Sequence, residues 1–169
     1  MTKFFVPFLL IFISLSATAQ TERTLKFSVG AELGFASGSF SNTHSIGTGV
    51  TAQAEYQLAE KLRATATTGF LVYAGKSQGT NLKNTAQTII PIRGGIKYFL
   101  AGGAYVGAQS GLAILGSYDK NVSFAYSPLL GYEFMTKSGK SLDATLKYDA
   151  YSGSNGTIGA IGVRLAYVF

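Results

Sequence analysis

The sequence predicts an all-β protein, an eight-stranded antiparallel up-and-down barrel that spans a membrane. Two observations lead to this fold class. Eight segments alternate between apolar and polar side chains, which is the period of two of a strand whose two faces meet different surroundings. Breaks rich in glycine, serine and asparagine separate the segments, and longer and shorter breaks alternate along the chain, as in transmembrane barrels.

The N-terminal residues are expected to form a secretory signal peptide. Lys3 supplies a positive charge, residues 4–16 are mostly apolar, and Ala17-Thr18-Ala19 has the small residues that a signal peptidase requires. A membrane-spanning helix would need about 20 apolar residues, and Pro7 interrupts a run that is already shorter. We therefore predict a signal peptide over residues 1–19 and one barrel domain over residues 20–169.

The strands follow in order between turn-like clusters. Longer breaks are expected after the first, third, fifth and seventh strands, which places the long loops at one rim of the barrel. Pro91 and Pro128 fall inside expected strands and predict a bulge or other irregularity there, or a register displaced by one residue. The predicted strands are residues 25–35, 48–58, 62–73, 87–100, 103–115, 121–134, 141–151 and 157–169.

The two faces of these strands differ sharply in charge. One face is apolar, with no charged residue and with few small hydroxyl residues, among them Thr68 and Ser110. A soluble, lipocalin-like barrel would turn that face inward and would leave few charges outside. A charge on a lipid-facing position costs about 2–4 kcal/mol at the centre of the bilayer. The apolar face is therefore predicted to face lipid, with aromatic residues such as Tyr132 and Phe70 near its two rims.

The opposite face carries five acids and six bases, which we expect to pair within the barrel. Side chains just fill the interior of an eight-stranded barrel, so a core of paired charges is expected in place of an aqueous lumen. Arg164 is expected near Ala144, within diagonal reach of Asp143 and of Lys147. We expect Arg164 to pair with Asp143, or with an acid across the lumen such as Glu133 or Glu32. The predicted interior network comprises Lys26, Glu32, Glu55, Arg63, Arg93, Lys97, Glu133, Asp143, Lys147, Asp149 and Arg164.

The last strand ends in Tyr167-Val-Phe169, with hydrophobic residues at its two terminal outward positions. With the strand pattern, this ending resembles the small outer-membrane β-barrel family of Gram-negative bacteria, particularly the porin-like proteins of the Bacteroidetes type. The resemblance implies location in the cell outer membrane and contact with its lipid and lipopolysaccharide. It also implies that Tyr167 and Phe169 form a C-terminal signal for the barrel-assembly machinery.

A non-enzymatic role is expected, structural or in surface interaction, exerted through short extracellular loops by a monomeric barrel. A narrow channel for small or hydrophobic solutes is one alternative, and a lipid A-modifying enzyme is another. His44, the single histidine, lies in the first long loop without an acid to orient it, so no catalytic residue is predicted. The chain has no cysteine and no metal-ligand cluster or phosphate-binding loop, so no metal or cofactor is expected. Its basic residues are scattered, which argues against a nucleic-acid partner.

Overall fold

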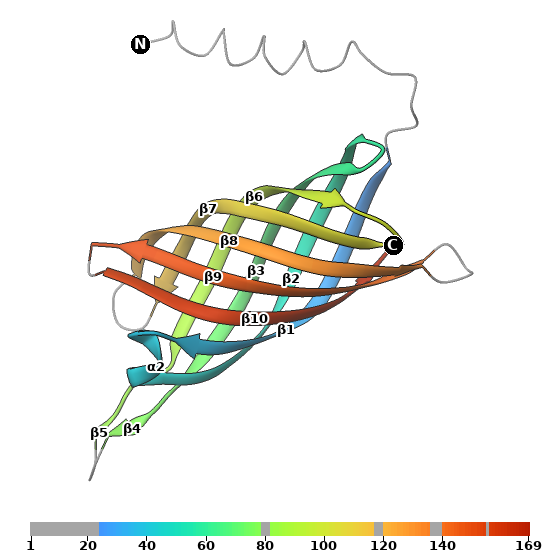
Figure 1. Cartoon of the computed structure of the whole chain (residues 1–169). Helices are drawn as coiled ribbons and strands as arrows, with labels where there is room; N and C mark the ends of the chain where they lie inside the picture. Colours follow the sequence, from blue (N-terminus) through green and yellow to red (C-terminus); the bar gives the residue numbers. More distant parts are fainter. Residues whose placement is uncertain (1–23, 79–81, 117–119, 136–139, 155) are drawn as a thin grey trace, which may run out of the picture.

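The protein folds as a closed barrel of eight antiparallel strands (Figure 1), which confirms the predicted fold class. The structure, a computed structural model, describes residues 24–78, 82–116, 120–135, 140–154 and 156–169, so the predicted signal peptide lies outside the described residues. Around the barrel the strand order is β1-β10-β9-β8-β7-β6-β3-β2. The strands are β1 (Leu25–Ser37), β2 (His44–Ala59), β3 (Leu62–Gly75), β6 (Gln87–Phe99), β7 (Ala104–Gly116), β8 (Lys120–Met135), β9 (Ser141–Gly153) and β10 (Gly156–Val168).

The first and last strands close the barrel. In their ladder Val29 pairs with Tyr167 and Phe35 with Ile161. The backbones of Phe27 and Phe169 exchange two further hydrogen bonds, 3.2 Å and 2.9 Å long. Among the eight described strands closure leaves no unpaired edge, which removes the usual route to edge-to-edge association.

The two ends of the barrel differ, as Figure 1 shows. One end, here called the loop end, carries the short helix α2 (Phe40–Thr43) and a small ribbon of β4 (Ser77–Gln78) and β5 (Leu82–Lys83). The other end, here called the terminal end, carries the start of β1, the end of β10 and the connections from β2 to β3, from β6 to β7 and from β8 to β9. Neither α2 nor the ribbon was predicted. Within the described part of the chain, no helix is both long and apolar enough to span a membrane.

Two glycines make the tight β6–β7 connection possible at the terminal end. Gly102 and Gly103 have φ angles of 61° and 97°, in the left-handed region that other residues rarely adopt. The turn is closed by hydrogen bonds from Leu100 N to Ala104 O and from Ala104 N to Ala101 O, at 2.8 Å and 3.0 Å.

The two prolines interrupt ladders without moving the register. On the β3 side of Pro91, pairing stops after Thr68↔Ile92 and resumes at Leu71↔Ile89 in the same register. Pro128 leaves a similar gap between β8 and β9. The missing N–H of proline therefore breaks the ladder on one side only, and the predicted irregularities occur without a bulge or a slipped register. The register shifts in the ladders lie instead at the two ends of β2.

The faces of the barrel follow the predicted alternation. Large apolar side chains such as Val50, Ile92 and Leu165 are exposed on the outside, at 59 %, 57 % and 57 %. Charged and hydroxyl side chains turn inward and are buried. Because this arrangement inverts that of a soluble protein, the outside of the barrel is suited to contact with lipid.

Candidate functional site

Seven charged side chains form a continuous network in the half of the lumen nearest the terminal end. Glu133 accepts hydrogen bonds from Lys26, at 3.1 Å, and from Arg63, at 2.5 Å. Arg63 also reaches Glu55 at 3.2 Å, and Lys97 joins Glu55 to the rest of the group at 2.7 Å. The terminal-end network comprises Lys26, Glu55, Arg63, Lys97, Glu133, Asp143 and Arg164.

Asp143 is the best-satisfied carboxylate of this network. It receives hydrogen bonds from Lys97 at 2.9 Å, from the Tyr105 hydroxyl at 2.8 Å and from the Thr145 hydroxyl at 2.6 Å. Arg164 lies farther away, with its Nη1 3.5 Å from Asp143 Oδ1. The ammonium of Lys97 also lies 4.3 Å from the centre of the Tyr105 ring. Buried charge is tolerated here because each carboxylate has several donors.

A second and smaller group, the loop-end ion chain, lies in the other half of the lumen. It consists of Glu32, Lys147, Asp149 and Arg93, from three different strands. Lys147 lies 2.6 Å from Glu32 and 3.1 Å from Asp149, and Asp149 pairs with Arg93. Ser127 completes the chain through hydrogen bonds with Arg93 and Asp149. Two acids and two bases leave this group without net charge.

Uncharged polar side chains occupy the space between the two groups. Gln109 donates to Gln53 at 3.2 Å and to Thr67 at 3.0 Å, and Thr67 donates to Gln53 at 3.0 Å. The Arg164 guanidinium also extends toward these uncharged side chains, and its Nε donates a hydrogen bond to the Thr51 hydroxyl at 2.8 Å. In the described residues no ion pair joins the terminal-end network to the loop-end ion chain.

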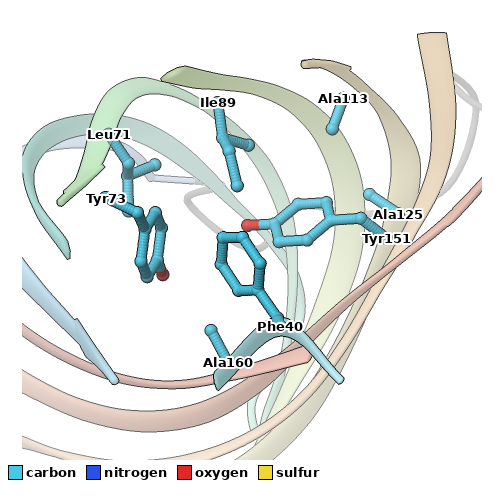
Figure 2. Close-up of a cluster of buried hydrophobic side chains, with 8 residues drawn as sticks. All are labelled: Phe40, Leu71, Tyr73, Ile89, Ala113, Ala125, Tyr151 and Ala160. Atoms are coloured by element: carbon cyan, nitrogen blue, oxygen red, sulfur yellow. The ribbon is translucent and has the colours of Figure 1, made fainter. Parts of the chain in front are cut away.

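Apolar side chains close the lumen at the loop end, as Figure 2 shows. Phe40 of α2 lies between Tyr73 and Tyr151, which reach inward from opposite sides. The ring centres of Phe40 and Tyr73 are 5.2 Å apart in an edge-to-face arrangement. This apolar cap comprises Phe40, Leu71, Tyr73, Ile89, Ala113, Ala125, Tyr151 and Ala160.

Glycines make room for the large rings inside the barrel. Gly34 and Gly47 pair across β1 and β2, directly beside the ring of Tyr73. A Cβ atom added to Gly47 would lie 2.6 Å from that ring, which is too close for any packed side chain. Gly131 gives similar room to Tyr105. These glycines are required by close approach, since a wider residue would displace the tyrosines.

His44 stabilises the cap from the rim. Its ring stacks on Phe40 with the centres 4.6 Å apart. Nε2 donates to the Thr85 carbonyl oxygen at 3.1 Å, so Nδ1 is left to accept from the Thr43 hydroxyl at 2.8 Å. His44 lies beyond Ile46, the exposed apolar residue of β2 nearest this rim. Burial lowers the pKa of His44 below 6.5, although the bond to Thr85 acts in the opposite direction. With both ring nitrogens engaged, the geometry of His44 is that of a packing residue.

A hollow of about 590 Å³ opens at the terminal end. It lies between the turns near Glu60 and Gly102 and reaches Arg63, Phe99 and Glu133. Arg63 lies 4.1 Å from the Phe99 ring centre and is already paired with Glu133. Arg63 and Glu133, two charged residues that line the hollow, therefore belong to the terminal-end network. Among the described residues, no group of three or more His, Asp or Glu side chains is arranged to hold a metal ion.

The structure places the eleven charged residues singled out from the sequence inside the barrel, each in at least one ion pair. Arg164 lies opposite Thr145, one residue from the expected position near Ala144, and its expected ion pair with Asp143 is present at 3.5 Å. Tyr167 and Phe169 lie at the terminal end with their ring centres 6.0 Å apart, and their part in assembly stays a prediction. Sequence reasoning missed the inward tyrosines, although their position in the alternation, between outward apolar residues, was a usable signal.

Comparisons with known proteins agree with this architecture. The outer membrane protein beta-barrel domain family matches residues 7–169. Neisserial surface protein A (NspA) is similar in structure, with a TM-score of 0.57, 16 % identity, and coverage of 88 % of this chain and 98 % of that one. Ail, the attachment invasion locus protein of Yersinia pestis, has a TM-score of 0.58 and 11 % identity, with coverage of 88 % and 100 %. No curated protein matches the chain in sequence.

The chain belongs to the outer membrane protein beta-barrel domain family. This confirms the resemblance and the location in the outer membrane that the sequence predicted. In such barrels the short turns face the periplasm and the longer loops face outward. By this general rule we expect the terminal end to face the periplasm and the loop end to face the outside of the cell.

Proposed function

We propose that this protein is a non-enzymatic outer-membrane barrel with a filled interior, whose structural or surface-interaction role is exerted at its extracellular rim. The observation that carries the proposal is the obstruction of the lumen. The apolar cap closes the extracellular end, and the loop-end ion chain and the terminal-end network lie behind it. Because these three groups obstruct the lumen, the side chains that a partner can reach lie on the outside of the barrel and at its rims.

The extracellular rim is modest in size, which limits the partners that it can engage. α2 and the β4–β5 ribbon are its structured parts in the described chain. The similarity to Neisserial surface protein A and to the attachment invasion locus protein, Ail, supports a role at the cell surface. At 16 % and 11 % identity that similarity extends to the fold alone. We propose outer-membrane lipid and lipopolysaccharide as surroundings, the barrel-assembly machinery as a partner during biogenesis, and a monomeric state.

The absence of catalysis is proposed from the state of His44. A hydrolase or acyltransferase would need a nucleophile beside a free base at the rim. His44 has the Thr43 hydroxyl on one nitrogen and a backbone carbonyl on the other. Its ring also stacks on Phe40, which fixes its orientation in the cap.

Two measurements test the proposal. Purified protein in planar bilayers is expected to give no stable single-channel currents, and such currents would favour the channel alternative. Lipid A from cells that express the protein is expected to keep its mass. A shift by one acyl chain would favour the lipid A-modifying enzyme, and the His44→Ala variant would then show whether His44 takes part.

A further inference from the structure

Among the described residues, the ion pairs of the lumen leave one positive charge without a counter-charge. The loop-end ion chain has two acids and two bases and is therefore neutral. The terminal-end network has four bases and three acids, which gives it a net charge of +1. Its two most exposed side chains are both basic, Lys26 at 27 % and Arg63 at 14 %, whereas the other five are at most 3 % exposed. The unbalanced positive charge is therefore accessible at the terminal end.

One edge of the Arg63 guanidinium has no protein partner in the described chain. Both hydrogen bonds of Arg63 leave from Nη1, to Glu55 at 3.2 Å and to Glu133 at 2.5 Å. Nε and Nη2, which form the other edge, make no hydrogen bond with the described residues, and neither atom is buried. Two parallel N–H groups on one edge can bind a planar carboxylate through two hydrogen bonds. The Phe99 ring, whose centre lies 4.1 Å from the guanidinium, supports this group from one side.

Arg63 lines the hollow of about 590 Å³ at the terminal end. Gly102 contributes no side chain to this hollow, and the Tyr132 hydroxyl lies 3.7 Å from the place where a Cβ atom of Gly102 would be. Glu60 is an exposed acid of the same lining and lies outside the terminal-end network. Glu133, which is already paired, lines the hollow as well. The other lining side chains are large and mostly apolar: Phe99, Tyr132, Phe134 and Met135.

These features together select one kind of ligand. A single unbalanced positive charge calls for one negative charge, and the free edge of Arg63 favours a planar carboxylate over a spherical ion. The apolar lining favours a small aromatic or aliphatic body attached to that carboxylate. Glu60 opposes an anion, but the charge of an exposed side chain is screened by water and salt.

We propose that the hollow at the terminal end is a binding site for a small monovalent carboxylate with an apolar body. Nε and Nη2 of Arg63 bind the carboxylate, the Tyr132 hydroxyl offers a further donor, and the rings of Phe99 and Phe134 contact the apolar body. The hollow opens at the rim of the barrel, so an occupied site is compatible with a filled lumen. The site does not involve the extracellular rim, so it stands or falls separately from the proposed function.

The first test compares a carboxylate with its uncharged isostere. para-Fluorobenzoate and para-fluorobenzamide are titrated into the detergent-folded barrel and followed by fluorine NMR, with empty micelles as the blank. Saturable binding of the benzoate is expected, with an affinity about tenfold or more above that of the benzamide, because hydrogen bonds to an ionised group are the stronger ones. Equal affinities, or a benzoate signal no larger than that with empty micelles, overturns the site.

The second test changes the two charged residues that face the ligand. Arg63→Lys keeps the positive charge that pairs with Glu133 but removes the planar edge, so the benzoate is expected to bind about tenfold more weakly. Glu60→Gln removes the opposing acid and should strengthen binding by about threefold. Lys76→Gln is the matched control, since it removes an exposed positive charge at the loop end and should leave the affinity unchanged.

The variants can contradict the site in three ways. An unchanged affinity in Arg63→Lys overturns it, and so does a loss in Lys76→Gln as large as that in Arg63→Lys. Glu60→Gln without a gain in affinity overturns it as well. Should Arg63→Lys fail to fold, Glu60→Gln and the comparison with the benzamide decide the proposal, since Glu60 is exposed and belongs to no ion pair among the described residues.

Discussion

Replacing Lys97 by methionine tests the interior network most directly. Lys97 is 1 % exposed and joins two carboxylates, Glu55 at 2.7 Å and Asp143 at 2.9 Å. Methionine has a similar length and no charge, so Lys97→Met removes the ammonium with little change in packing. Two buried carboxylates then lose their shared counter-ion, while the barrel wall stays the same.

The expected loss of folding free energy depends on the partners that the Glu55 and Asp143 carboxylates retain. Removing one partner of a buried ion pair costs about 3–5 kcal/mol. Glu55 keeps Arg63 at 3.2 Å, and Asp143 keeps the hydroxyls of Tyr105 and Thr145. The loss should therefore fall near the lower end, about 3 kcal/mol. With a urea dependence of about 1–3 kcal/mol per molar, the midpoint of unfolding should fall by about 1–3 M.

The assay is urea unfolding of the detergent-folded barrel, followed by circular dichroism and by the gel mobility of unheated samples. Lys140→Met is the matched control, because Lys140 is exposed beside β9 and its loss should move the midpoint little. Adding Asp143→Asn to Lys97→Met should recover part of the loss, since the unpaired charge is then removed as well. Equal midpoints for Lys97→Met and Lys140→Met would refute a dry, charge-paired interior and would indicate a hydrated one.

Three further outcomes are expected. Leu146→Arg places a charge on the lipid face and should cost about 2–4 kcal/mol if the site lies at mid-membrane, measured by folding yield in vesicles; equal tolerance of Arg at exposed Ser77 would contradict this face. N-terminal sequencing of the exported protein should begin near Gln20, and an intact N-terminus in the envelope fraction would exclude cleavage after Ala19. Because burial lowers the pKa of His44 below 6.5, the stability that the cap gains is complete above about pH 6.5 and is lost as the pH falls further. Amide exchange in α2, corrected for intrinsic rates, should therefore quicken between pH 7.5 and 5.5, and a His44→Gln variant should abolish that difference.

The faces of the strands were predictable because the alternation of side chains is a local property. Val163 and Arg164 must lie on opposite faces of any strand that contains both. The cost of a charge in lipid then decides which face is outside. The eight strands and the inward direction of the charges therefore followed without knowledge of any contact between strands. The connection after the seventh predicted strand was expected to be long and is a tight one, because β9 ends at Gly153 and β10 begins at Gly156.

The partners inside the barrel were beyond such reasoning. Lys26 and Glu133 are 107 residues apart in the chain and meet at 3.1 Å across the lumen. Their contact depends on the registers of several ladders. A change of one residue in any of these registers would place a different residue opposite each position. The error of one residue at Arg164, opposite Thr145, has this cause.

The sequence by itself determined an exported, lipid-facing barrel. The alternation of side chains and the free-energy cost of placing a charge in lipid can both be assessed for each strand separately. The tertiary structure alone decided that the interior charges divide into two groups, and that Phe40 returns from a loop to cover the lumen. α2 is too short to produce a helical pattern in the sequence. A helix of this length is stable only through its tertiary contacts, here the packing of Phe40 against the tyrosine rings. Closure of the barrel brings Tyr73 and Tyr151 to either side of Phe40, and that geometry exists only once the strands have joined.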